Sequence, residues 1–329
     1  MQYQKLGNTG LSVSRLGIGT MTFGLQTEEA TSHAILDRVV DAGVTFIDTA
    51  DVYPIGGTLE TVGRTEEIIG RWLPGKRDQV ILASKAVGKM GPHAWQQGAS
   101  RKHLLSAVED SLRRLNTDYL DLYQLHSDDA ETPIDETLEA LDSLVRSGKV
   151  RYIGVSNFLA YRLALALGRS DTRNLARFVS VQPRYSLLFR EIERELLPLA
   201  AEQNIGVVVY NPLAGGLLSG KHRLGTPTAG TRFTLGSIAG RYQERYWHER
   251  EFATIEALKE LAAEYDSDLV TASIAWVLAN PTVTTALIGA SRPEQLEQTL
   301  AASELQLAPG FKARLDELTH EYRFGDAVR

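Results

Sequence analysis

The sequence contains no cysteine among its 329 residues. Disulfide bonds, cysteine nucleophiles and cysteine-ligated metal sites are therefore excluded. The chain also lacks an excess of positive charge, because 35 Lys and Arg residues face 41 Asp and Glu residues and give a net charge of −6. No cluster of Lys or Arg offsets this balance, so a nucleic-acid partner is not expected.

Long apolar runs are missing as well. The first twenty residues lack a basic stretch followed by an apolar core, and no run approaches the roughly 20 apolar residues needed to cross a bilayer. We therefore expect an intracellular, cytoplasmic protein with no membrane partner.

His126 has no neighbour at ligand spacing, and His93 and His103 look isolated, so no metal site is expected.

Short apolar runs alternate with helical patterns along almost the whole chain. Strands are expected at 16–19, 44–48, 80–84, 119–125, 152–155, 178–182, 207–210 and 285–288. Helices are expected between them, with Thr27, Ser100 and Thr132 as N-caps. Eight strands that alternate with helices predict one (β/α)8 TIM barrel over residues 1–329, with a C-terminal extension. The long segment 211–250, after the seventh strand, is expected to be a loop that covers the barrel mouth.

Four different chemical groups lie at or just beyond the ends of these strands. Asp48, Lys85 and His126 each end a strand, and Tyr53 lies on the loop that follows Asp48. Alone, each residue has an ordinary structural explanation, such as a cap, a loop aromatic or a solvated charge. In a barrel the carboxyl ends of the strands meet at one rim, so the four together predict a catalytic site.

Several sequence stretches carry a family likeness with their order and spacing kept. They are 46–50 with Tyr53, Lys85, 125–126, 154–158, 181–182, 210–221 and 288–291. In these stretches the chain resembles the aldo-keto reductases over essentially its full length, and within them the bacterial and potassium-channel β-subunit-like branch. It departs from the family at Asn211, where serine is usual, and at Ala290 and Thr299 in the adenosine site, which leaves NAD(H) open beside NADP(H).

The resemblance implies hydride transfer from a nicotinamide to a carbonyl carbon, with Tyr53 as general acid and base. A phenol with an ordinary pKa of about 10 is protonated at neutral pH, and the ammonium of Lys85 would favour the tyrosinate left behind. Asp48 would hold Lys85 in place. His126 would donate to the carbonyl oxygen and orient the substrate.

The resemblance also implies a cofactor site. Its predicted residues are Gly19, Thr20, Met21, Asp48, Ser156, Asn157, Gln182, Tyr210, Asn211, Pro212, Leu213, Gly215, Leu217, Lys221, Arg232, Ile288, Gly289, Ser291, Arg292, Gln295 and Gln298.

Within this set, amide and hydroxyl groups suit the carboxamide of a nicotinamide, and the ring of Tyr210 suits its face. Ser291 and Arg292 open the last barrel helix, where a 2′-phosphate would be stabilised, which favours NADP(H). Strand-end capping, core packing and a surface arginine are the alternative explanations.

The stretch from Gly215 to Lys221 also matches the phosphate-loop pattern Gly-x-x-x-x-Gly-Lys. The next residue is His222, whereas that pattern needs Ser or Thr to hold magnesium. The stretch is therefore interpreted as a glycine-rich pyrophosphate contact. No Gly-x-Gly-x-x-Gly follows a strand, so a Rossmann site is disfavoured.

The expected substrate is a small carbonyl or alcohol compound, in a pocket formed by Phe23, Tyr53, Trp95 and His126. The predicted function is reversible, NADP(H)-dependent reduction of an aldehyde or ketone. Two alternatives stay open: a nicotinamide-binding regulatory or sensor subunit with little turnover, and an NAD-linked sugar or alcohol dehydrogenase.

Overall fold

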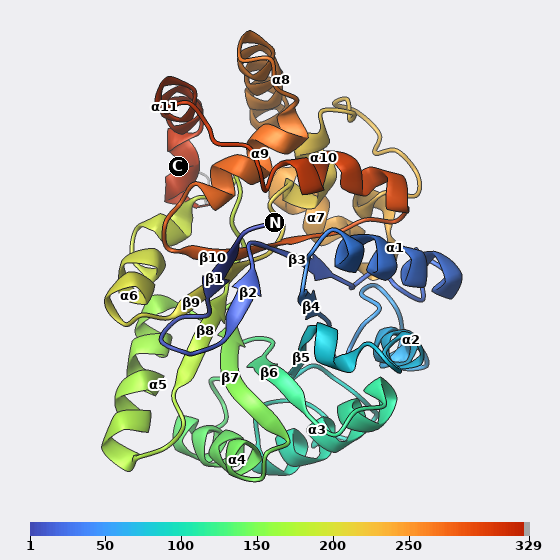
Figure 1. The fold of residues 1–329 in the computed structure, drawn as a ribbon, viewed down its shortest axis with the longest axis vertical. Coiled ribbons are helices and arrows are strands. Elements are labelled where there is room, and N and C mark those ends of the chain that lie inside the picture. Colours follow the sequence, from blue (N-terminus) through green and yellow to red (C-terminus); the bar gives the residue numbers. More distant parts are fainter. Residues whose placement is uncertain (326–329) are drawn as a thin grey trace.

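The computed structural model describes residues 1–325, and a closed barrel of eight parallel strands forms its centre (Figure 1). The strands follow one another around the barrel in chain order, and the last pairs with the first. They are β3 (Leu16–Gly19), β4 (Phe46–Asp48), β5 (Ile81–Ala86), β6 (Leu120–Leu125), β7 (Val150–Ser156), β8 (Phe178–Gln182), β9 (Gly206–Val209) and β10 (Val283–Ile288). The predicted (β/α)8 barrel is confirmed.

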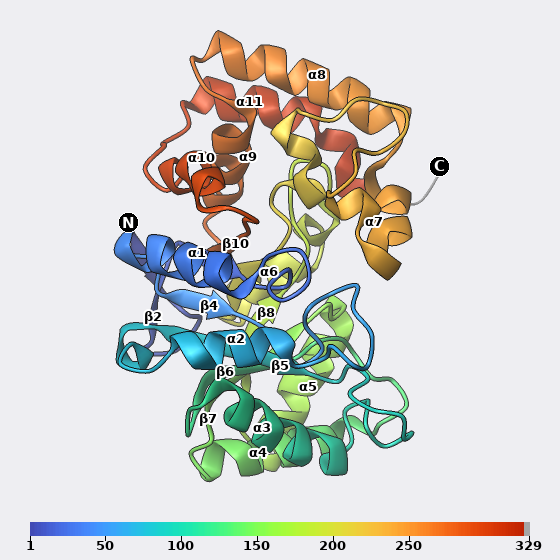
Figure 2. The same ribbon diagram turned by 90° about the vertical axis from the view of Figure 1, so that its right-hand side faces the viewer.

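Helices cover the outside of this barrel (Figures 1 and 2). They are α1 (Glu29–Asp41), α2 (Arg64–Trp72), α3 (Arg101–Leu115), α4 (Ile134–Arg146), α5 (Ala160–Arg173), α6 (Leu196–Glu202), α9 (Leu269–Leu278) and α10 (Leu296–Ala301). Helix α3 shows why they form: Leu104, Val108 and Leu115 recur at helical spacing and are buried, and the Ser100 hydroxyl accepts a hydrogen bond from the backbone N–H of His103.

Two predicted N-caps are wrong. Helix α1 begins after Glu28, and the hydroxyl of Thr27 has no hydrogen-bond partner within residues 1–325. Helix α4 begins after Pro133. The hydroxyl of Thr132 donates instead to the carboxylate of Asp129 at 2.7 Å, and a charged acceptor makes the stronger bond.

A β-hairpin that the sequence did not predict closes the amino-terminal end of the barrel. Strands β1 (Tyr3–Lys5) and β2 (Ser12–Ser14) pair antiparallel. Leu6 and Val13 of this hairpin are fully buried. They pack in one cluster with Phe46, Ala83, Leu122, Val208 and Leu287 of the barrel strands. The hairpin therefore leaves the carboxyl ends of the strands as the accessible mouth.

The segment after β9 is not the structureless loop that the sequence predicted. Between residues 211 and 250 it contains the 3-10 helices η3 (Ala214–Ser219), η4 (Arg232–Thr234) and η5 (Gly236–Ile238) and then α7 (Ala239–Tyr246), and α8 (Glu249–Glu264) follows, where a helix was expected. The Gln26 amide donates to the carbonyl of Gly230 at 2.8 Å. Gly236 has a φ of +48°, and a Cβ there would lie 2.6 Å from the carbonyl oxygen of Gly56. The segment thus contacts the loops that follow β3 and β4.

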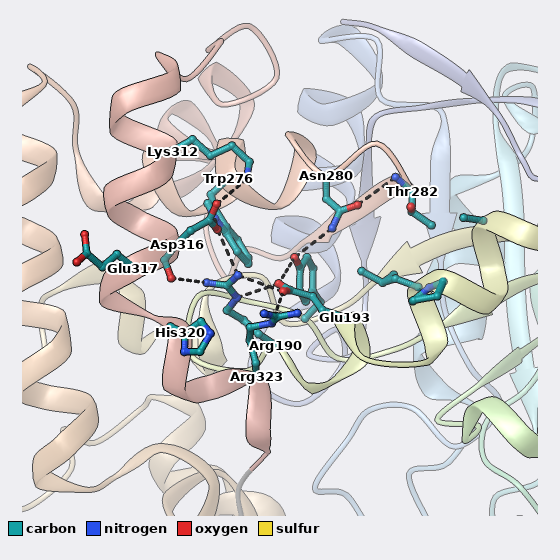
Figure 3. A pocket seen from close by; sticks show the side chains of 14 residues that line it. Arg190, Glu193, Trp276, Asn280, Thr282, Lys312, Asp316, Glu317, His320 and Arg323 are labelled. Carbon is teal, nitrogen blue, oxygen red and sulfur yellow. Dashed lines mark hydrogen bonds and ion pairs between the residues drawn. The ribbon is translucent and has the colours of Figure 1, made fainter.

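The C-terminal extension packs on α8 and on the barrel. Helix α11 (Pro309–Leu318) lies beside α8, and η7 (His320–Phe324) follows (Figures 1 and 2). Figure 3 shows Arg190 between Glu193 and Asp316. Its buried guanidinium donates to the Glu193 carboxylate at 2.8 Å and to the Asp316 carbonyl at 2.9 Å. This network joins the extension to the barrel.

Within residues 1–325 no helix has the length and apolar character needed to cross a membrane.

Candidate active site

A cavity of about 1050 Å³ opens at the carboxyl ends of the barrel strands. Residues at or just after the ends of β3, β4, β6, β7, β8, β9 and β10 line it, and the segment after β9 forms one wall. This is the end of the barrel at which enzymes of this architecture place their reactive groups.

Asp48 and Lys85 form a buried ion pair at the cavity floor. The Lys85 ammonium donates to the Asp48 carboxylate at 2.5 Å and to the carbonyl of Thr49 at 2.8 Å, and both charged side chains are almost completely buried. The other carboxylate oxygen of Asp48 accepts from the amides of Gln182 at 2.8 Å and Gln124 at 3.1 Å. These bonds satisfy the buried charges and fix the direction of the ammonium.

Gln124 is a site residue that the sequence did not predict. It lies inside the run 119–125, and a fully buried polar side chain among the apolar residues near the end of this strand was the signal that could have identified it.

Tyr53 and His126 face each other beside the Asp48–Lys85 pair. The ring centroids of Tyr53 and His126 are 5.6 Å apart, with the rings nearly perpendicular. The Lys85 ammonium lies 5.1 Å from the centroid of the Tyr53 ring. Tyr53 and His126 line the cavity, and Lys85 lies behind them. The structure thus brings the four predicted catalytic residues to one place.

The surroundings shift the proton affinities of both rings. Burial, and then the charge of Asp48, raise the pKa of Tyr53 well above its usual value of 10. Burial and the nearby Lys85 lower the pKa of His126 to about 3. At neutral pH the site therefore holds a protonated phenol and a neutral imidazole. The pKa of Tyr53 is thus raised, mainly by burial, and not lowered by the nearby ammonium of Lys85.

Most of the predicted cofactor residues line the cavity. They are Gly19, Thr20, Met21, Asp48, Ser156, Asn157, Gln182, Tyr210, Asn211, Pro212, Leu213, Gly215, Lys221, Arg232, Ile288, Gly289, Ser291, Arg292 and Gln295. Leu217 and Gln298 do not. Leu217 is fully buried in the hydrophobic core, and Gln298 is exposed, with its carbonyl accepting a hydrogen bond from Thr271.

Hydrogen bonds within the protein already orient the polar groups at the ends of β7, β8 and β9. Asn157 has a φ of +57°, and its amide nitrogen donates to the carbonyl of His126 at 2.9 Å. The Tyr210 hydroxyl donates to the Asn157 amide oxygen at 2.8 Å, and the Ser156 hydroxyl donates to the carbonyl of Gln182 at 2.9 Å. The ring of Tyr210 is thus held against this wall.

The groups present fit a dinucleotide. Lys221, Arg232 and Arg292 line the cavity, and none of them pairs with a carboxylate within residues 1–325. A Cβ at Gly289 would lie 3.1 Å from the Arg232 guanidinium, and a Cβ at Gly215 would lie 2.7 Å from the Tyr242 ring. Because glycine has no side chain, these two positions leave room in the cavity wall. The neighbouring Lys and Arg side chains suit the phosphate groups of a dinucleotide.

Two of the predicted substrate residues lie elsewhere. Phe23 is fully buried in the hydrophobic core, and Trp95 is 53% exposed and stacks on His93, with ring centroids 4.5 Å apart. Neither is among the residues that line the cavity. Both residues were chosen because they lie in predicted loops. A loop position does not show in which direction the aromatic ring points.

Other residues line the cavity instead of Phe23 and Trp95. The cavity wall includes Thr22, Ile55, Ile238, Arg241, Tyr242 and Arg245. Tyr242 could have been identified from the sequence as an aromatic residue in a predicted loop. The other five belong to no motif that the sequence shows. Across residues 1–325 no three His, Asp or Glu side chains lie close enough together to hold a metal ion.

Comparison with known proteins identifies the family of the chain. The model of the "Aldo/keto reductase family" matches residues 15–320. The chain is 40% identical to the uncharacterized oxidoreductase YrpG of Bacillus subtilis, over 93% of this chain and 92% of the relative. It is 35% identical to Protein tas of Escherichia coli, over 98% and 99%. It is 34% identical to a probable voltage-gated potassium channel subunit beta of Arabidopsis thaliana, over 93% and 92%. The resemblance seen in the sequence is confirmed, and the chain belongs to the aldo/keto reductase family.

Proposed function

We propose that the protein is an NADP(H)-dependent reductase of aldehydes or ketones that also works in reverse as an alcohol dehydrogenase. Family membership and the oxidoreductase name of a relative support the coarser statement that it is a carbonyl-reducing oxidoreductase. The observation that carries the finer proposal is the buried Asp48–Lys85 pair next to the Tyr53 ring, with His126 against the edge of that ring.

Tyr53 is the proposed general acid. When bound, the reduced nicotinamide supplies a hydride to the carbonyl carbon. The phenol of Tyr53 gives its proton to the carbonyl oxygen, so that the carbonyl becomes an alcohol, and the tyrosinate later regains a proton from water. The neutral ring of His126 donates a hydrogen bond to the same oxygen. Lys85, held by Asp48, stabilises the tyrosinate for the time that it exists.

The proposed cofactor contacts follow the cavity wall. Ser156, Asn157 and Gln182 would hold the carboxamide, and Tyr210 would stack on the nicotinamide ring. Lys221 and Arg232 would contact the pyrophosphate. Ser291 and Arg292, directly after β10, would contact a 2′-phosphate, and this contact supports NADP(H) over NAD(H).

A panel of aldehydes and ketones, assayed with NADPH and with NADH through the loss of reduced-cofactor absorbance, tests the proposal. We expect turnover with NADPH and a weaker rate with NADH. Equal or better turnover with NADH would favour the sugar or alcohol dehydrogenase alternative. Tight binding of NADPH without turnover of any carbonyl would contradict the enzyme assignment and favour a regulatory subunit, the role suggested by the name of the Arabidopsis relative.

A further inference from the structure

The cavity is a positively charged region in an acidic protein. Its basic lining residues are Lys221, Arg232, Arg241, Arg245 and Arg292. Among the described residues that line it, the only carboxylate is Asp48, which Lys85 already neutralises. The whole chain has a net charge of −6. Positive charge is therefore concentrated at this site, where it attracts anions.

Two of these cations, Arg241 and Arg245, lie on one face of α7. They are four residues apart, which is one helical turn, and both line the cavity. Neither pairs with a carboxylate within residues 1–325. Like charges at this spacing destabilise a helix slightly, and an anion bound in the cavity would relieve their repulsion.

Helix α7 lies on the reactive side of the cavity. Ile238, just before its first turn, contacts Gly56 on the loop that carries Tyr53: a Cβ at Gly56 would lie 3.6 Å from the Ile238 side chain. Near its end, the charge of Arg245 acts to lower the pKa of the Tyr210 hydroxyl, although burial raises that pKa overall. The helix thus spans the wall between the proposed acid and the proposed nicotinamide platform.

The other three cations lie toward the proposed cofactor phosphates. The Arg232 guanidinium lies against Gly289, directly after β10, and Arg292 follows three residues later. Lys221 follows the glycine-rich turn η3. These three cations match the negative charges of a phosphorylated dinucleotide. Arg241 and Arg245, on the cavity wall that α7 forms, remain without a matching anion.

We propose that Arg241 and Arg245 bind an anionic group of the substrate, so that the preferred substrates are small carbonyl compounds that carry a carboxylate or a phosphate. This inference rests on the proposed function, because the anion is placed relative to the carbonyl that Tyr53 protonates. Paired guanidinium groups one turn apart suit the several oxygens of either anion through charge-assisted hydrogen bonds.

Three aldehydes with one common ring test the inference. They are 4-carboxybenzaldehyde, 4-formylphenyl phosphate and the neutral 4-formylbenzamide. We expect wild-type kcat/KM to be about tenfold or more higher for at least one of the two anions than for the amide, since hydrogen bonds to charged groups have that strength. We expect Arg241→Gln and Arg245→Gln each to raise KM for that anion about tenfold, with little change in kcat. KM for the amide should not change.

Arg223→Gln is the matched control, because Arg223 is an exposed arginine whose partner is Glu256 and which does not line the cavity. NADPH binding by fluorescence titration is measured for every variant. Equal wild-type kcat/KM values for the amide and both anions would overturn the inference. So would variants that weaken NADPH binding without changing the preference among aldehydes, because the arginines would then belong to the cofactor.

Failure of the proposed function gives a different result. If the protein binds NADPH but reduces none of the three aldehydes, the reductase proposal fails. Calorimetric binding of the same aldehydes to the NADP⁺-loaded protein then tests the arginines separately. Anion binding that is lost in Arg245→Gln would support the anion site, and equal binding of amide and anions would overturn it.

Discussion

The Lys85 ammonium lies 5.1 Å from the centroid of the Tyr53 ring, while its hydrogen bonds go to Asp48 and Thr49. The ammonium is thus held in place by two acceptors before any substrate binds. Burial, and then the negative charge of Asp48, raise the pKa of Tyr53, so the phenol keeps its proton at neutral pH. The arrangement favours a protonated acid at rest, with a cation nearby when the tyrosinate forms.

Replacing Tyr53 with Phe should remove the proton donor and leave the fold intact. We expect the rate of carbonyl reduction to fall by about 10²- to 10⁴-fold, the usual contribution of a positioned general acid. NADPH affinity and the free energy of unfolding should change little. Tyr161→Phe, which removes the hydroxyl of an exposed tyrosine, is the control. A Tyr53→Phe enzyme with wild-type turnover would exclude the proposed role.

His126 should remain neutral across the physiological range. Its pKa is lowered to about 3 from 6.5 by burial and by Lys85, so it binds no proton between about pH 5 and pH 8. We expect its ring proton signals in NMR to stay constant over this range, with His126→Gln used to assign them. An ionisation midpoint near 6.5 would show that water or a counter-charge reaches the ring and that an imidazolium takes part.

The barrel could be predicted because its strands are short apolar runs with abrupt ends. The runs that end at Asp48 and Gln182 were placed at the correct terminal residue. The hairpin at Tyr3–Lys5 and Ser12–Ser14 was missed because strands of three residues, two of them polar, show no clear period. Its burial depends on the barrel that it closes.

The carboxyl ends of the barrel strands were predicted to within two residues, whereas the direction of loop side chains was not predictable. Asp48 and Lys85 meet because strand pairing fixes both. Trp95 has no such constraint and stacks on its neighbour His93. The wall that carries Arg241 and Arg245 depends on contacts between distant segments, such as the close approach of Gly236 to Gly56, which no local pattern shows.

Asp51 should hold a proton at neutral pH. It is fully buried, and neither carboxylate oxygen has a hydrogen-bond partner within residues 1–325. Nearby Glu66 already takes hydrogen bonds from Ser84 at 2.5 Å and Arg114 at 2.8 Å. Burial, and then the charge of Glu66, raise the pKa of Asp51 well above 3.8. Arg114 can neutralise only one of the two acids, Glu66. The carboxyl group of Asp51 is therefore expected to be neutralised by a proton.

This proton makes stability depend on pH in a defined direction. Above pH 3.8 the unfolded chain releases the proton of Asp51 while the folded chain keeps it, so the free energy of unfolding falls as pH rises toward the folded pKa. Asp51→Asn cannot ionise, and we expect it to be more stable than wild type at neutral pH, by about 1.4 kcal/mol for each unit of pKa elevation that the pH has crossed.

Urea unfolding of Asp51→Asn at several pH values checks this expectation, and Glu66→Gln is the matched comparison. We expect Glu66→Gln to destabilise the protein, because it leaves the half-buried Arg114 without its partner. If Asp51→Asn lost stability to the same extent as Glu66→Gln, Asp51 would be an ionised partner of Arg114 and the protonated state would be wrong.

Arg190 should be the main link between the C-terminal extension and the barrel. Its guanidinium is buried and donates to Glu193, to the Asp316 carbonyl and to the Thr319 hydroxyl (Figure 3). Arg190→Met keeps most of the side-chain volume but leaves the Glu193 carboxylate with only the Tyr185 hydroxyl at 2.9 Å and the Arg323 guanidinium at 3.1 Å. Breaking a buried pair in this way costs about 3–5 kcal/mol.

Arg314→Met provides the matched control for Arg190→Met, because Arg314 pairs with Glu264 on the surface, with both side chains about half exposed. We expect this variant to lose less than about 1 kcal/mol. Urea unfolding followed by circular dichroism compares the two, and proteolysis of the folded proteins reports whether α11 detaches first. Equal losses in both variants would mean that the apolar contacts of Phe311 and Leu315 hold the extension in place without help from Arg190.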